Sequence, residues 1–105
     1  MNERKIISYM GFARKARRLT AGTEACRAGL DKKEIKIIVL AGDVAENTAD
    51  KWHTLAERAG VPLVVVGTIE ILSQATGNFN RGIYGVTDKE LAQAISRAAQ
   101  GEERK

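Results

Sequence analysis

The sequence predicts an α/β fold, a three-layer α/β/α sandwich built on a mixed four-stranded sheet. Segments with apolar residues at helical spacing alternate along the chain with short apolar runs typical of strands. Those runs are apolar on both faces, as in a sheet covered by helices on both sides, and the connections between them are short. The 105 residues suffice for one such domain and not two. We expect the domain to span residues 1–100, with residues 101–105 as a frayed tail.

The elements follow one another in the order αβαβαβαβα. In chain order they are expected at residues 3–16, 18–20, 23–30, 35–43, 48–59, 63–67, 69–76, 82–86 and 87–99. The first helix is amphipathic, with Ile6, Ile7, Met10 and Ala13 on one face. The runs "IKIIVLAGD" and "LVVVG" predict two strands that are buried on both faces.

Capping residues set the expected ends of the later helices. Asn47 is a plausible N-cap for the third helix, and Gly60 ends it. Thr68 precedes the fourth helix as its N-cap, and Gly77 closes it. "TDKE", which begins at Thr87, reads as a capping box that opens the last helix.

Positive charge is concentrated near the N-terminus. The formal net charge is +4, but residues 4–36 hold ten lysines and arginines against three acids, a local net charge of +7. Such a one-sided field attracts polyanions and speeds their encounter with the protein. An ordinary solvated face is the alternative, and charge alone does not decide between them.

Residues for catalysis, metal binding or cofactor binding are scarce. No Gly-rich nucleotide motif is present, and one cysteine with one histidine cannot make a zinc site. We expect Cys26 to be a small buried apolar residue and His53 to lie on the surface. The sequence therefore predicts no enzyme, no cofactor and no metal.

Asp43 follows a buried strand, where α/β folds place ligand contacts. The same acid in "GDVAEN" also suits a role in ordering the turn, and this role is favoured because Asp is a common turn residue. A small enzyme that uses Asp43 would lack any accompanying base–nucleophile pair.

The stretch "RRLTAGTEACRAG" is the first candidate contact for nucleic acid. A glycine turn that leads into a helix presents backbone N–H groups and the positive helix end to a ligand. Thr23 and Glu24 lie at this turn, and the Glu24 carboxylate can accept a hydrogen bond from a base amino group. Arg17 and Arg18 flank the turn in sequence and are expected to grip the RNA backbone.

The stretch "ATGNFNRGI" is the second candidate contact. Phe79 stands between Asn78 and Asn80, with Arg81 next. An aromatic side chain in a polar loop is a candidate platform for an unstacked base. The alternative is that Phe79 folds back onto the sheet. With the charge asymmetry, the two stretches make RNA the leading class of partner.

Four longer stretches resemble a known family. They are "GFARKARRLTAGTEA", "KIIVLAGDVAENTADK", "GVPLVVVGTIEILSQATG" and "GVTDKELA". Together they make the chain similar to the bacterial YlxQ-like proteins, relatives of the ribosomal protein L7Ae and L30e superfamily that binds kink-turn RNA. The resemblance runs from about Ile7 to Ala99 and agrees with the α/β/α sandwich.

The resemblance implies a non-catalytic protein that binds a sharply bent RNA loop with sheared G·A pairs. It places one contact in the turn before the second helix, here Gly22 to Arg27, and another in the loop before the last strand, here Gly77 to Arg81. The expected RNA-binding residues are Arg17, Arg18, Gly22, Thr23, Glu24, Arg27, Asp43, Asn78, Phe79 and Arg81.

The first loop departs from the family pattern G-x-N-E-x-x-K. Laid on without a gap, Gly22 matches the Gly, but Glu24, Ala25 and Ala28 take the places of the Asn, Glu and Lys. Shifted by one residue, the same places fall to Thr23, Glu24 and Arg27. The ungapped register is preferred because it also fits the following strand.

These observations predict a cytoplasmic, monomeric RNA-binding protein that associates with the ribosome or the translation machinery and has no membrane contact. One cysteine fits a reducing compartment, and no run approaches the roughly 20 apolar residues of a membrane span. A protein-binding adaptor on the same fold is the alternative, because a fold does not fix a function. The loss of the motif lysine and asparagine favours it.

Overall fold

The computed structural model describes residues 1–101, and residues 102–105 of the expected tail lie outside the described part. The order of helices and strands is the predicted one. The helices are α1 (Glu3–Lys15), α2 (Thr23–Asp31), α3 (Glu46–Ala59), α4 (Ile69–Thr76) and α5 (Lys89–Gln100). The strands are β1 (Leu19–Ala21), β2 (Ile37–Leu40), β3 (Leu63–Val65) and β4 (Ile83–Val86).

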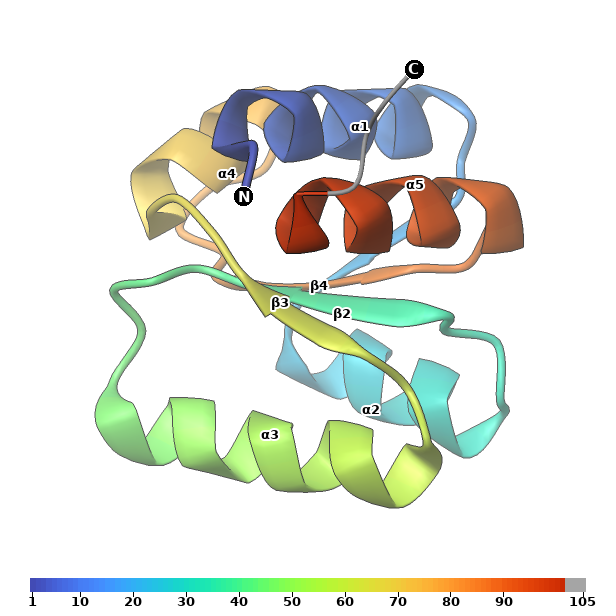
Figure 1. Cartoon of the computed structure of the whole chain (residues 1–105). Helices are drawn as coiled ribbons and strands as arrows, with labels where there is room; N and C mark the ends of the chain where they lie inside the picture. Colours follow the sequence, from blue (N-terminus) through green and yellow to red (C-terminus); the bar gives the residue numbers. More distant parts are fainter. Residues whose placement is uncertain (102–105) are drawn as a thin grey trace.

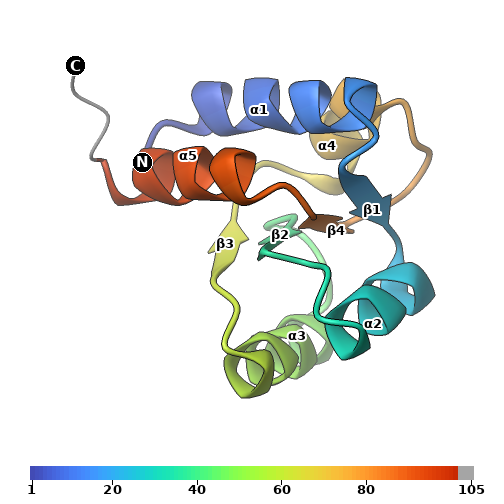
Figure 2. The same cartoon turned by 90° about the vertical axis from the view of Figure 1, so that its right-hand side faces the viewer.

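The strands form one mixed sheet in the order β1-β4-β2-β3. β2 and β3 run parallel, whereas β4 lies antiparallel to both β1 and β2. Figure 2 shows the sheet almost along its strands, with β1 at one edge and β3 at the other. The predicted mixed four-stranded sheet is confirmed.

Two layers of helices cover the sheet. α1, α4 and α5 lie on one face, and α2 and α3 lie on the other (Figure 1). Each face has its own apolar cluster, because alternate residues of β2 point to opposite sides. Ile37 and Val39 face the three-helix layer, and Ile38 and Leu40 face α2 and α3. The α/β/α sandwich is therefore confirmed.

One strand is less buried than the sequence suggested. β2 is fully buried, as predicted, but β3 is buried only at Val64, and Val65 is 41% exposed. The expectation of a second strand buried on both faces was wrong, because "LVVVG" lies at the edge of the sheet, where one side has no neighbouring strand.

Two helix starts also differ from the capping assignments. α3 begins at Glu46 after the extended residue Ala45, so Asn47 lies inside the first turn and is not the N-cap. α5 is capped by Asp88, whose carboxylate accepts from the Leu91 N–H at 2.8 Å, and not by Thr87. At α5 the two candidate caps Thr87 and Asp88 are adjacent in sequence, whereas α3 starts after an alanine that has no capping side chain, so composition alone does not fix the capping position.

Other helix ends match the sequence. Thr68 caps α4 by accepting from the N–H of Ile71 at 3.1 Å, and Gly60 and Gly77 end α3 and α4 in the left-handed conformation. No helix within residues 1–101 is long and apolar enough to cross a membrane.

Candidate nucleic-acid interface

The two loops chosen from the sequence meet at one end of the sheet. The Gly22 N–H donates to the carbonyl of Ile83, the first residue of β4, at 2.9 Å. β1 ends immediately before Gly22, and β4 begins immediately after the loop of residues 77–82. We call the turn of residues 22–24 and the loop of residues 77–82 the loop pair.

The glycine at position 22 allows the two loops of the loop pair to pack against each other. Its backbone has φ 98° and ψ 161°, a conformation nearly restricted to glycine. A Cβ atom built on Gly22 would collide with the guanidinium of Arg81 and would lie 3.3 Å from its Cζ. Because the α-carbon is bare, the Arg81 side chain packs directly over the turn before α2.

Buried hydroxyl groups hold Arg81 in this place. Ser73 of α4 accepts from the Arg81 N–H at 2.9 Å and donates to the Arg81 carbonyl at 3.2 Å. The Tyr84 hydroxyl donates to the same carbonyl at 2.9 Å. The Arg81 backbone is thus tied at both polar atoms, and the loop is shaped before any ligand arrives.

The start of the loop is anchored separately. The Asn78 side-chain amide donates to the Thr76 Oγ1 at 2.9 Å, and Thr76 itself donates to the Leu72 carbonyl at 2.7 Å. Arg14 of α1 covers Gly77, since a Cβ built there would lie 2.7 Å from the Arg14 Cζ. Gly77 has φ 70°, so both space and conformation favour glycine.

Phe79 points away from the protein. Its side chain is 89% exposed, which excludes the alternative that it folds back onto the sheet. It lines a groove of about 500 Å³ together with Asn78, Asn80 and residues of α4. An exposed aromatic ring beside a groove of this size can stack on an unpaired base.

Asp43 lies in the same groove and also has a structural partner. Its carboxylate accepts from the N–H of Ile69, the first residue of α4, at 2.8 Å. A carboxylate at a helix N-terminus stabilises the helix dipole. This partner lies outside the "GDVAEN" turn that Asp43 was expected to order.

The first turn of α2 is open to solvent. Gly22 has no side chain to cap the helix, and Thr23, Glu24 and Ala25 are exposed. The backbone N–H groups of this turn and the Glu24 carboxylate are therefore available to a ligand next to Arg81.

The other arginines expected at this site lie elsewhere. Arg18 precedes β1 and accepts at its carbonyl from Thr87, at the opposite end of the sheet from Gly22. With a rise of about 3.3 Å per residue, the Cα atoms of Arg18 and Gly22 are roughly 13 Å apart. Arg17, with φ 60°, lies at the same far end. Arg27 lines a groove with Leu55 and Arg58, between α2 and α3.

Cys26 is buried, as expected. Its Sγ lies 3.7 Å from the Thr20 carbonyl and 3.9 Å from that of Ile83, beneath the loop pair. Burial raises the pKa of the Cys26 thiol from 9.0 to about 12, so the thiol stays protonated and unreactive near neutral pH. His53 is exposed on α3.

Sequence reasoning missed the residues that shape the loop pair. Arg14 lies in the last turn of α1, where a cation already suits the helix dipole, and Ser73, Thr76 and Tyr84 carry no local motif. Their roles depend on contacts between elements far apart in the chain. Hydroxyl residues spaced through an otherwise apolar segment are the signal that points to them, since buried polar groups need partners.

Known proteins are similar to this chain in sequence and in fold. The chain is 26% identical to the RNA-binding protein YlxQ of Enterococcus faecium over 100 residues, which cover 95% of this chain and 96% of that protein. A solved structure from Bacillus halodurans C, described as a protein with unknown function, superposes with a TM-score of 0.87 at 25% identity. That match covers 91% of this chain and 97% of the other.

A more distant structure shares the fold. The 15.5kD RNA binding protein of Giardia lamblia superposes with a TM-score of 0.75 at 13% identity, over 92% of this chain and 86% of its own. The family description and the name of the relative refer to non-enzymatic proteins, which agrees with the expectation that this chain is not an enzyme. Because the family model matches residues 4–96, the chain belongs to the ribosomal protein L7Ae/L30e/S12e/Gadd45 family.

Proposed function

We propose that this protein binds a structured RNA through the loop pair and recognises a sharply bent, kink-turn-like element. The observation that carries the proposal is the packing of Arg81 over Gly22, which joins two distant loops into one surface. The names of the relative from Enterococcus faecium and of the structure from Giardia lamblia, both RNA-binding proteins, support the choice of RNA.

The loop pair offers a different contact to each part of an RNA. The guanidinium of Arg81 suits a phosphate or a guanine edge, where it can donate two hydrogen bonds. Glu24 can accept from an exposed base amino group. Phe79 can stack on a base that has left the helix, and Asp43 lines the groove beside it. Together these contacts favour a bent RNA with unstacked bases over a regular duplex.

The conformation of Gly22 bears on the register of the family motif. Only the ungapped register aligns the glycine of the family motif with Gly22, whose φ is 98°. In that register Ala28 occupies the place of the motif lysine, and Arg27 lies beside α3. We infer that Arg81, which reaches over Gly22 from the second loop, supplies the positive charge that the motif lysine supplies elsewhere.

We further infer that the protein acts as a monomer in the cytoplasm and that its RNA belongs to the ribosome or the translation machinery. The buried, unpaired thiol of Cys26 fits a reducing compartment. The ribosomal members named in the family description favour a ribosomal RNA.

The test is a titration against a kink-turn hairpin and against the same hairpin with its sheared G·A pairs replaced by Watson–Crick pairs. We expect the protein to prefer the kink-turn. Arg81→Gln is expected to weaken that binding by about 1–3 kcal/mol, roughly tenfold to a hundredfold. Arg97→Gln, an exposed arginine on α5, is the matched control and should change little.

Two outcomes would contradict the proposal. Equal binding to both hairpins would mean a general electrostatic contact without recognition of the bend. Absence of binding to either RNA, together with a nuclease-resistant complex with another protein, would favour the adaptor function.

A further inference from the structure

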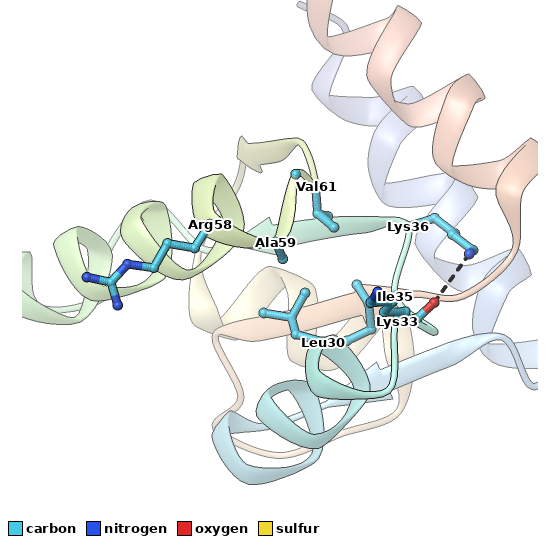
Figure 3. A pocket seen from close by; sticks show the side chains of 8 residues that line it. Leu30, Lys33, Ile35, Lys36, Arg58, Ala59 and Val61 are labelled. Atoms are coloured by element: carbon cyan, nitrogen blue, oxygen red, sulfur yellow. Dashed lines mark hydrogen bonds between the residues drawn. The ribbon is translucent and has the colours of Figure 1, made fainter.

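A basic groove lies at the end of the sheet opposite the loop pair. It has a volume of about 530 Å³ and runs between the end of α2, the residues before β2 and the end of α3. Lys33, Lys36 and Arg58 line it together with the apolar residues Leu30, Ile35, Ala59 and Val61. Figure 3 shows Lys33 and Lys36 on one side of the groove and Arg58 on the other, with its side chain extending away from the two lysines. Within residues 1–101, no carboxylate lines this groove.

The charges in the groove are not neutralised by the protein. Lys33, Lys36 and Arg58 form no ion pair with any residue from 1 to 101. The Lys36 ammonium donates to the Lys33 carbonyl at 3.4 Å, a contact that orients it without cancelling its charge. A second, smaller groove shares Lys36 and adds Lys89 of α5, which extends the basic surface toward the other helix layer.

Helix ends alone do not account for this cluster. Cations near the ends of α2 and α3 complement the helix dipoles, which explains Arg58 in the last turn of α3. Lys36 lies outside any helix, just before β2. The carbonyls of Ala28, Gly29 and Leu30 at the end of α2 already accept from backbone N–H groups, so these three carbonyls do not account for the lysines.

The groove suits an anion better than an apolar peptide. Leu30 is only 8% exposed and Ile35 only 2%, so the apolar floor offers little surface to bury. The side chains of Lys33, Lys36 and Arg58 are all exposed to solvent. Exposed cations that lack a carboxylate partner are typical of a surface that neutralises phosphates.

We propose that the basic groove binds the phosphate backbone of a second RNA segment, outside the element held by the loop pair. The choice of RNA as the polyanion rests on the proposed function. The two sites lie at opposite ends of β1, β4 and β2, so one protein molecule contacts two stretches of RNA and holds them at a fixed separation.

The test uses a plain A-form RNA duplex, which offers phosphates without a bend. The groove variant carries Lys33→Gln, Lys36→Gln and Arg58→Gln. The control variant carries Arg4→Gln, Lys51→Gln and Arg97→Gln, which remove the same net charge from exposed sites outside the groove. Duplex affinity is measured over a salt series, and circular dichroism checks the fold of each variant.

We expect the groove variant to bind the duplex about tenfold or more weakly than the control variant, with a salt dependence reduced by roughly one per lost phosphate contact. Its preference for the kink-turn hairpin over the Watson–Crick version should be retained. Arg81→Gln should show the reverse pattern, with the kink-turn preference lost and duplex affinity reduced less than in the groove variant. If the triple variant unfolds, Lys36→Gln alone replaces it, and we expect a smaller loss in the same direction.

Equal duplex affinity of the groove and control variants would overturn the proposal while leaving the proposed function intact. Conversely, the wild-type protein could show no preference for the kink-turn while the groove variant binds the duplex more weakly than the control. That result would overturn the proposed function and support phosphate binding by the basic groove. A groove variant that keeps its duplex affinity but loses binding to poly-glutamate would overturn the RNA assignment and give the groove to an acidic protein.

Discussion

The grooves at the two ends of the sheet have opposite linings. The groove beside the loop pair is lined by the carboxylates of Asp43 and Glu70 and by no cation within residues 1–101. The basic groove at the other end is lined by three cations and, within the same residues, by no carboxylate. The first has an exposed aromatic ring at its margin, and the second has none.

This difference separates two kinds of RNA contact. Carboxylates repel phosphates but accept hydrogen bonds from base amino groups, so the groove at the loop pair favours a base. Lysine and arginine neutralise phosphates without reading the sequence, so the basic groove favours the backbone. The loop pair is also fixed by buried hydrogen bonds, whereas the cations of the basic groove are held only loosely. The two proposals therefore assign recognition and general affinity to different ends of the same sheet.

The largest effect that would break this comparison is expected from Gly22→Ala. The methyl group would collide with the Arg81 guanidinium, and the backbone at φ 98° disfavours any side chain. We expect a loss of about 1–3 kcal/mol in the free energy of unfolding and a loss of kink-turn preference. Thermal unfolding and the paired hairpin titration measure the two effects.

The double variant Gly22→Ala/Arg81→Ala separates the two causes. Removing Arg81 relieves the collision but not the backbone strain, so the double variant should be more stable than the sum of the single changes predicts. Strict additivity would mean that the two residues do not pack together. Duplex binding should be reduced less in all three variants than in the groove variant, because the basic groove lies at the other end of the sheet.

Phe79→Ala is expected to affect binding without affecting folding. The side chain is 89% exposed, so its removal should change the free energy of unfolding by less than about 0.5 kcal/mol. Loss of a stacked base should weaken kink-turn binding by about 1–3 kcal/mol. Phe79→Tyr, which keeps the ring, is the control and should bind normally. A stability loss in Phe79→Ala would show that the ring packs on the protein instead.

Most of the fold could be predicted from the sequence because it follows from local patterns. Helical periodicity, apolar runs and glycine positions gave the order of all nine elements within residues 1–101. The burial of β3 could not be predicted in this way. "IKIIVLAGD" and "LVVVG" read alike, but one lies in the centre of the sheet and the other at its edge, and that order depends on strand pairing.

The candidate site was predicted only in part. Both loops could be predicted, because their glycines, their charged residues and an aromatic residue between polar neighbours form local sequence patterns. Arg17 and Arg18 were placed beside Gly22 by their nearness in sequence, but a three-residue strand carries the chain to the opposite end of the sheet. Arg81, about 60 residues after Gly22 in the sequence, occupies the position expected for Arg17 and Arg18. No local sequence pattern predicts the contact between Arg81 and Gly22.

Tyr84→Phe tests whether the hydroxyl groups shape the loop pair, with a moderate expected effect. The change removes the 2.9 Å hydrogen bond to the Arg81 carbonyl, which keeps its second bond from Ser73. We expect a loss of about 1 kcal/mol in stability and a weaker kink-turn preference, with normal duplex binding. Thermal unfolding and both titrations provide the measurement. A weakened duplex interaction would show that the two ends of the sheet are not independent.

The smallest predicted effect is a pH dependence of stability that comes from the Cys26 thiol, which is buried beneath the loop pair. The pKa of Cys26 is raised by burial from 9.0 to about 12, so the folded state keeps the thiol proton at a pH where the unfolded chain has lost it. Because the unfolded chain then binds fewer protons, stability falls as pH rises above about 9 and continues to fall toward 12.

Cys26→Ala removes this contribution, so the stability difference between wild type and variant should shrink as the pH is raised from 8 to 9.5. The change over this range should be less than about 1 kcal/mol, measured by urea denaturation at each pH. Subtracting the variant cancels the titration of the lysines and tyrosines common to both proteins. A difference that stays constant with pH would mean that water reaches the thiol under the turn. In that case the Cys26 side chain beneath the contact of Arg81 with Gly22 would be hydrated, and the loop pair would be less rigid than its hydrogen bonds indicate.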